Sequence, residues 1–358
     1  MKTTLKLTIA LFIGTLLMGA CQQAEEPVME QDQTVASATR AFGDKTPVVT
    51  IYVETNDINP LNAGDYILSD GTTYADIVEF FASNIHKRTV DGVVEPTLYL
   101  NDKLTRLLEP DPSAPTTTGY HKYVKPLQEK GIKVLLTVLG DWQGIGVANM
   151  NDTQTTQFAK ILAQVVYNYN LDGIGFDDEY SDYPSGSFVN GSFGDIISKL
   201  HNLMPDKMIT VFQYNNVGSS QITSSDGALI DYVYSNFATY NTNIQVAGVT
   251  KEHYAPIAIN LGNYISPTSA QYFMGYANSA AADGYGAIMH FNLRTKAERD
   301  QTTLFNYIAT GAWGKSVSVS STPDNAANRP QDWDFISTGF EITMDDVVNF
   351  QTKGDRPV

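Results

Sequence analysis

Short apolar runs alternate with longer amphipathic stretches from Pro47 onward. Residues 48–54 (VVTIYVE) and 133–139 (KVLLTVL) are almost continuously apolar, as strands are when both faces of a parallel sheet are covered. Residues 152–168 instead repeat apolar side chains at intervals of three and four, which predicts an amphipathic helix with Asp152 as its N-cap. An alternation of strand and helix is typical of βα units around a parallel sheet.

The same pattern continues along the chain. Further strands are predicted at 82–86, 97–100 (as an excursion), 173–177, 207–213, 230–234, 254–260 and 286–291. Further helices are predicted at 117–130, 193–202, 266–282 and a last stretch ending near 311, with a helix or turn region at 73–82. About eight strands over roughly 265 residues match a regular or irregular (β/α)8 TIM barrel, which forms a single domain over residues 47–313. A doubly wound sheet would need a glycine-rich phosphate turn after the first strand, and residues 54–57 (ETND) offer none.

The first 20 residues have the plan of a lipoprotein signal peptide. A short basic start precedes an apolar segment at 7–18 and two small residues, and this segment is too short to cross a bilayer as a stable helix. Residues 17–21 (LMGAC) resemble a bacterial lipobox, which predicts cleavage before Cys21 and lipidation of its sulfur. Residues 22–26 (QQAEE) resemble the acidic export signal of surface lipoproteins in Bacteroidetes. We therefore expect a cell-envelope protein, lipid-anchored to the outer-membrane surface of a Gram-negative bacterium.

Two segments flank the predicted barrel. Residues 21–46 are polar and acidic without apolar periodicity, which predicts a flexible tether. Residues 314–358 form a C-terminal extension that is rich in serine near its start. We expect this extension to be either an added hairpin or a loose segment, and the sequence assigns it no function.

Charge narrows the range of partners. The formal net charge is -16 and the pI is about 4.6. Such a surface repels nucleic acid and anionic membranes, so we expect no nucleic-acid partner and membrane contact through the lipid anchor only. Neutral sugars meet no such penalty, and the 20 Tyr, 16 Phe and 3 Trp include candidates for stacking on sugar rings, although most should fill the core. The protein is expected to be a monomer.

The candidate chemistry lies at the end of the predicted strand 173–177. On one strand that runs through residues 171–180, Gly175, Asp177 and Glu179 share one face, which points into the mouth of a barrel. Two neighbouring carboxylates repel, so the pKa of one should rise and that group can serve as a general acid. The alternative is an acidic cluster that binds Ca²⁺ or caps a loop. The five histidines show no metal-ligand spacing, and His290 is expected to be a core residue of an apolar strand.

Residues 172–179 (DGIGFDDE) resemble the signature of glycoside hydrolase family 18, in which spaced acids end in a catalytic Glu. The family acid at the position of Gly175, which normally helps to orient the middle Asp, is missing. Five further segments resemble the endoglycosidase H-like endo-β-N-acetylglucosaminidases in the same order, and they are 52–54, 81–85, 131–140, 204–207 and 283–286. The resemblance covers residues 47–313.

The resemblance implies hydrolysis of the GlcNAc-β-1,4-GlcNAc core of N-linked glycans on glycoproteins or glycopeptides, chiefly high-mannose ones, by substrate-assisted retaining catalysis. Glu179 would donate the proton and then act as base, Asp177 would orient the substrate's acetamido group, and no metal or cofactor would be needed. Candidate substrate-binding residues at the ends of predicted strands are Gln213, Tyr234, Asn236, Phe291, Asn292, Tyr52, Asn84 and Trp142. The alternatives are a chitinase and, because Gly175 replaces an acid, a barrel that binds glycans without cutting them.

Overall fold

The computed structural model describes residues 45–111, 114–214, 216–236, 239–320, 326–331 and 338–347. The predicted signal peptide, Cys21 and all but the last residues of the tether lie outside this part of the chain. None of the described helices is long and apolar enough to cross a membrane.

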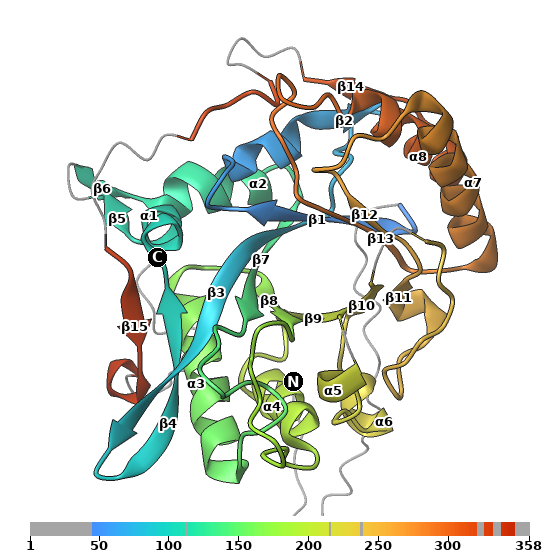
Figure 1. The fold of residues 1–358 in the computed structure, drawn as a ribbon. Helices are drawn as coiled ribbons and strands as arrows, with labels where there is room; N and C mark the ends of the chain where they lie inside the picture. The colour runs from blue at the N-terminus through green and yellow to red at the C-terminus, as the bar shows by residue number, and fades with distance from the viewer. Residues whose placement is uncertain are drawn as a thin grey trace, which may run out of the picture. The chain divides into compact units, whose positions relative to one another are not determined.

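Parallel strands curl into a nearly closed barrel (Figure 1). Their order around the barrel is β11 (Tyr254–Ala255), β10 (Tyr232–Ser235), β9 (Met208–Gln213), β8 (Gly173–Asp177), β7 (Lys133–Leu139), β3 (Ile77–Val90), β1 (Val48–Glu54), β13 (Ala287–Phe291) and β12 (Ala258–Asn260). The two short strands β11 and β12 divide the predicted strand 254–260: β11 pairs with β10, and β12 pairs with β13. Counted as one broken strand, they give the eight positions of the predicted (β/α)8 barrel, which is confirmed.

The helices follow the strands as in repeated βα units, with gaps. The longer ones are α3 (Asp152–Asn168), α4 (Ser192–Leu203), α7 (Pro267–Asp283) and α8 (Thr302–Trp313), and the short ones are α5 (Asn216–Ser219) and α6 (Ser224–Gly227). Between β10 and β11 the described residues contain only the 3-10 turn η3 (Lys251–His253). The predicted cap of α3 was wrong, because the N-cap is Asn151 and not Asp152. The Asn151 side chain accepts from the backbone N–H of Gln154, and the Gln154 side chain accepts from the backbone N–H of Asn151.

The predicted helix or turn at 73–82 was also wrong, because β3 begins at Ile77 and runs to Val90. Its first part lies between β1 and β7, where both faces are buried. Its second part leaves the barrel and pairs antiparallel with β4 (Val93–Leu100). The acidic residue Glu79 interrupts the apolar run in the sequence, yet it is fully buried, so burial of this acid is what hid the strand.

The connection from β4 to β7 is more broken than the predicted helix 117–130. It holds α1 (Asp102–Leu108), β5 (Pro110–Asp111), β6 (Ala114–Thr118), a π-helical turn η2 (Tyr120–Val124) and α2 (Lys125–Gln128). The chain then turns at Gly131 in a left-handed conformation that suits glycine.

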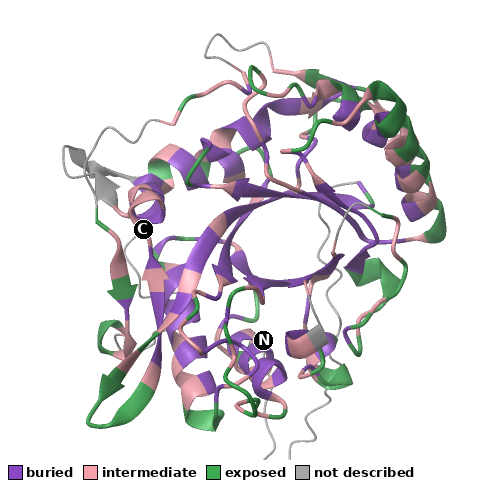
Figure 2. Cartoon of the chain, viewed as in Figure 1, coloured by how far each residue is buried: buried purple, intermediate pink, exposed green. Residues whose placement is uncertain are grey.

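Two apolar cores hold the barrel. One fills its interior with side chains from the strands, among them Ile77, Leu135 and Met208. The larger one lies between the sheet and the surrounding helices. The strands are accordingly buried along most of their length (Figure 2). A barrel filled in this way is a rigid base for the side chains at its mouth.

The C-terminal extension packs back onto the barrel unit. Strand β14 (Val317–Val319) pairs with β2 (Tyr66–Leu68), and β15 (Phe340–Ile342) pairs with β4. The 3-10 turns η1 (Pro60–Asp65) and η4 (Met344–Asp346) complete the described elements. The described parts of the extension therefore form neither a hairpin of their own nor a loose segment.

Asp65 ties this extension to the barrel. It is fully buried and pairs with Arg329, with Lys130 at 3.2 Å and with the backbone N–H of Ala327 at 2.7 Å. A buried carboxylate with this many partners is a strong local anchor, because removal of the carboxylate leaves the partners unpaired.

Candidate active site

A cavity of about 250 Å³ opens at the carboxyl ends of the strands. Its lining combines three carboxyl groups with aromatic rings from several strands, and it consists of Tyr52, Glu54, Phe81, Asp177, Glu179, Tyr180, Phe212, Met289, Phe291 and Asn292. In parallel barrels this end carries the active site, because the loops that follow each strand converge there.

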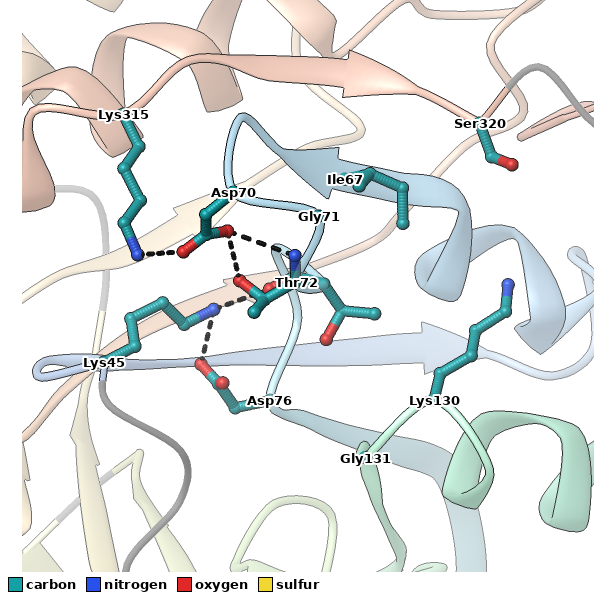
Figure 3. A pocket seen from close by; sticks show the side chains of 11 residues that line it. Lys45, Ile67, Asp70, Gly71, Thr72, Asp76, Lys130, Gly131, Lys315 and Ser320 are labelled. Atoms are coloured by element: carbon teal, nitrogen blue, oxygen red, sulfur yellow. Dashed lines mark hydrogen bonds and ion pairs between the residues drawn. The ribbon is translucent and has the colours of Figure 1, made fainter.

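A larger cavity of about 580 Å³ lies at the opposite, amino end of the strands (Figure 3). Its lysines are neutralised within the protein: Lys45 pairs with Asp76 at 2.9 Å and Lys315 with Asp70 at 2.5 Å. Lys130 pairs with Asp65. The charged groups of the larger cavity thus form ion pairs with one another, as expected at the end of a barrel that contributes to stability. The smaller cavity is therefore the candidate site.

Asp177 is the last residue of β8 and is only 6% exposed. Burial raises its pKa well above the ordinary value, and the charges of Glu179, Asp178 and Glu79 add to the rise. Its Oδ1 atom is buried without a hydrogen-bond partner in the described part of the chain. Such an atom is costly unless a ligand completes its bonding, so Asp177 is suited to contact a substrate.

Glu179 does not belong to the strand, because β8 ends at Asp177 and the prediction that strand alternation carries Glu179 was wrong. The loop instead turns so that both carboxyl groups line the cavity. Backbone hydrogen bonds tie this loop to the one after β7, from Gly140 N to Glu179 O at 3.0 Å and from Trp142 N to Tyr180 O at 2.6 Å. Burial raises the pKa of Glu179, against a hydrogen bond from Tyr180 that lowers it.

Asp178 lies outside this cavity and supports the loop. Ser181 and Tyr183 donate hydroxyl hydrogen bonds to its Oδ1 at 3.0 and 2.7 Å. Burial raises the pKa of Asp178. The predicted division between a functional Asp177 and a neighbour that faces elsewhere fits this arrangement.

The predicted substrate-binding residues divide into two groups. Tyr52, Phe291 and Asn292 line the cavity, whereas the other five do not. Gln213 accepts from the backbone of Gln245, and Tyr234 is fully buried deeper in the barrel. These two side chains therefore support the barrel around the cavity.

The remaining three lie toward the rim. Asn236 donates to the backbone O of Tyr214, and Asn84 donates to the backbone O of Gly140. Trp142 is 64% exposed and packs against Tyr180, with ring centroids 4.7 Å apart. The exposed ring of Trp142 is therefore open to a ligand.

Sequence reasoning missed Glu54, the third carboxyl group of the cavity. Burial and the charge of Asp57 raise the pKa of Glu54 to about 7, against the opposing charge of Arg294. Glu54 ends its strand as Asp177 does, and that shared position is the signal that could have identified it. The missed apolar residues, Phe81, Phe212 and Met289, carry no such signal in the sequence.

The described residues contain no group of three or more His, Cys, Asp or Glu side chains placed to hold a metal ion. His290 is fully buried, bonds the Tyr74 hydroxyl at 2.8 Å, and has its pKa lowered to about 3 by burial. It is the core residue predicted from its apolar strand. The site therefore offers carboxyl groups and aromatic rings, a combination suited to proton transfer on a neutral, ring-shaped substrate.

Comparison with known proteins gives consistent matches. The endo-β-N-acetylglucosaminidase of Flavobacterium sp. (strain SK1022) is 32% identical over 253 residues, which cover 69% of this chain and 75% of the relative. The endo-β-N-acetylglucosaminidase F1 of Elizabethkingia meningoseptica is 28% identical over 345 residues, 90% of this chain and 96% of the relative. No family model matches the chain.

Among solved structures, EndoBT-3987 of Bacteroides thetaiotamicron, in complex with a Man9GlcNAc2Asn substrate, has a TM-score of 0.64 and 23% identity. The match covers 82% of this chain and 72% of that one. The same enzyme with its Man5GlcNAc product has a TM-score of 0.62 and 24% identity, over 82% of this chain and 67% of that one. These structures share the barrel fold.

Proposed function

We infer the function from one premise: the chain belongs to the endo-β-N-acetylglucosaminidases, glycoside hydrolases of family 18. We propose that it hydrolyses the GlcNAc-β-1,4-GlcNAc bond in the core of N-linked glycans, with high-mannose chains as its preferred substrates. The observation that carries this proposal is the pairing of Asp177 and Glu179 in one cavity at the carboxyl end of the barrel. The binding of Man9GlcNAc2Asn by the similarly folded EndoBT-3987 supports the choice of substrate class.

Glu179 is proposed as the general acid. Burial raises the pKa of Glu179, which is the direction that favours a group that must protonate a leaving oxygen. After the leaving sugar departs, the same carboxylate accepts a proton from the attacking water. Its half-buried position at the cavity wall lets both a sugar oxygen and a water molecule reach it.

Asp177 is proposed to orient the substrate's acetamido group, which acts as the nucleophile. In substrate-assisted catalysis the acetamido carbonyl oxygen of the cleaved GlcNAc attacks the anomeric carbon and forms an oxazolinium ring, with net retention after hydrolysis. The buried and unpartnered Oδ1 of Asp177 is suited to accept the acetamido N–H and to stabilise the positive charge that develops there. The aromatic walls exclude water from this step.

The test is a Glu179→Gln variant assayed on a defined Man9GlcNAc2 glycopeptide, with the released glycan and the GlcNAc-peptide measured by mass spectrometry. Removal of a general acid costs about 10²- to 10⁴-fold in rate. Glu129→Gln serves as the matched control, because the Glu129 carboxyl group is exposed and lies just after the C-terminal end of α2. This variant should cleave at the wild-type rate. Full activity of Glu179→Gln would overturn the assignment, and hydrolysis of chitin oligosaccharides without cleavage of the glycopeptide would favour a chitinase.

We also propose that the protein acts as a monomer and is anchored to the cell envelope through a lipidated Cys21. The support is the lipobox-like sequence around Cys21, the only cysteine of the chain. Incorporation of radiolabelled palmitate into the wild type, and its loss in Cys21→Ala, is the expected result. Light scattering of the soluble domain reports the oligomeric state.

A further inference from the structure

A second acid lies inside the barrel, beneath the candidate site. Glu79 comes from β3, pairs in register with Tyr52 of β1, and is fully buried. Its partners are hydroxyl groups: Thr210 donates to its Oε1 at 2.8 Å, Tyr234 to the same atom at 3.1 Å, and Thr137 to its Oε2 at 3.1 Å. Burial raises the pKa of Glu79 to about 7.

The Glu79 carboxyl group fills a space that β8 leaves open. A Cβ atom placed on Gly175 would lie only 1.9 Å from Oε2 of Glu79, so a side chain at position 175 would displace the Glu79 carboxyl group from its present position. Gly175 pairs with Thr137 on one side and with Thr210 on the other, the same two residues that hold Glu79. The absence of a side chain on β8 is thus matched by a carboxyl group supplied from β3.

This position is directly below Asp177. Gly175 and Asp177 lie two residues apart on one strand and share its inner face. The charge of Glu79 is among the causes that raise the pKa of Asp177. The Tyr52 hydroxyl is buried and hydrogen-bonds to Glu79. Burial raises its pKa, and the charges of Glu79 and Asp177 add to the rise, which puts this phenol close to both acids.

We propose that Glu79 is a positioning residue for the glycosidase reaction, and that from β3 it supplies the carboxyl group that orients Asp177 and Tyr52 in the space left by Gly175. This inference rests on the proposed function, because Asp177 must act on substrate for its orientation to matter. Glu79 itself is sealed below the cavity and does not touch substrate. When it is protonated, Glu79 can share its proton with the Tyr52 hydroxyl to which it hydrogen-bonds, and it then carries no charge that raises the pKa of Asp177.

A purely structural role is the competing explanation, and the energetics argue against it. A buried acid without a cation costs free energy that an apolar residue of similar size would not. Apolar side chains such as Ile77, Leu135 and Met208 fill the barrel interior beside the hydroxyl groups that hold it. Glu79 instead places a carboxyl group inside the barrel below Asp177, and three hydroxyl groups hold it there. This arrangement points to a use for the proton or the charge of Glu79.

The test compares Glu79→Gln with the wild type on the Man9GlcNAc2 glycopeptide. The amide keeps the shape of the side chain but cannot supply the acid's proton. We expect kcat to fall about 10- to 100-fold, as for misplacement of a catalytic group, with KM changed less than about 2-fold. Wild-type kcat in a folded Glu79→Gln variant overturns the inference while the proposed function stands. A wild type that cleaves no glycopeptide overturns both.

Relocation of the carboxyl group gives a second, independent readout. The double variant Glu79→Ala/Gly175→Asp moves the acid from β3 to β8, and its matched control Glu79→Ala/Gly175→Asn differs only by an amide in place of the acid. We expect the Asp form to turn over at least about 10-fold faster than the Asn form, since only the Asp form restores an acid beneath Asp177. Equal rates in two variants of equal melting temperature overturn the inference, because a space-filling role is served by either side chain. If both fail to fold, the Glu79→Gln result decides.

Discussion

Gly140 is the residue through which the loop after β7 holds Glu179, the proposed general acid, in place. The three atoms nearest to a Cβ atom at this position all belong to the backbone of the loop after β8: Glu179 O at 2.4 Å, Ser181 N at 2.5 Å and Ser181 Cα at 2.7 Å. Gly140→Ala therefore has no flexible side chain to push aside. The two loops must separate, and the hydrogen bond from Gly140 N to Glu179 O must lengthen or break.

The size of the effect follows from these distances. Real Cβ contacts lie beyond 3.0 Å, so the backbone around Glu179 must move by at least several tenths of an ångström. A displacement near 1 Å of a catalytic group costs about 10²-fold in rate, equivalent to about 2.7 kcal/mol at 1.36 kcal/mol for each factor of ten. Overpacking costs about 1–3 kcal/mol of stability, which lowers Tm by several degrees but leaves the barrel folded.

The assay measures kcat and KM for glycopeptide cleavage alongside Tm. Gly275→Ala is the matched control, because a Cβ atom there has no neighbour within 4 Å and the residue lies inside the helix α7. That control should keep its activity and melt at or slightly above the wild-type temperature. The reasoning is refuted if Gly140→Ala keeps the wild-type kcat, since the loop contact would then not set the position of Glu179.

Three further predictions concern pH, stability and the rim of the site. Burial raises the pKa of Glu79 from 4.5 to about 7, so the folded protein retains a proton there that the unfolded chain releases. This contribution to stability is complete below pH 4.5 and is lost as the pH rises through 7. Tm should therefore fall between pH 5.5 and pH 8, and it should fall less steeply in Glu79→Gln. Asp65→Ala leaves Arg329 and Lys130 without their buried partner and should cost roughly 3 kcal/mol, seen as a lower Tm with unchanged kcat at 25 °C. Trp142→Ala should change the free energy of unfolding by less than about 0.5 kcal/mol while KM rises several-fold, and an unchanged KM would show that this exposed ring does not contact the glycan.

Strands buried on both faces were the easiest elements to predict from the sequence. The ranges of β1, β7 and β8 match their predictions residue for residue, because continuous apolar runs end at polar residues just where the strands leave the barrel. The helix α3 was equally clear from its periodicity. Where a local pattern and its burial agree, no knowledge of the partner strands is needed.

The errors arose where a distant residue decides the local structure. Glu79 interrupts an apolar run in the sequence, and hydroxyl groups from distant strands, among them those of Thr137, Thr210 and Tyr234, make its burial tolerable. The predicted strand 254–260 reads as one strand, but Pro256 has no N–H to donate to a ladder, and the pairing changes partners there.

The site was half predictable for the same reason. Strand-end acids such as Asp177 can be recognised from sequence because carboxyl ends of parallel strands meet at one edge. The side chain of Glu179 reaches the cavity through a tie between two loops, which strand alternation does not describe. Phe81 and Phe212 are ordinary apolar strand residues until closure of the barrel brings them to one wall.

The pairing of β1 with β13 also means that the barrel can close only late in synthesis. Val48 pairs with Ala287, and Asp65 binds Arg329, which lies 264 residues later. At about 5–20 residues per second, the ribosome delivers β13 roughly 10–50 s after β1, and until then one edge of the first strand has no partner. The half-made chain is therefore the form most exposed to aggregation, and slower initiation of translation, which reduces the number of unfinished chains present together, should raise the yield of folded protein.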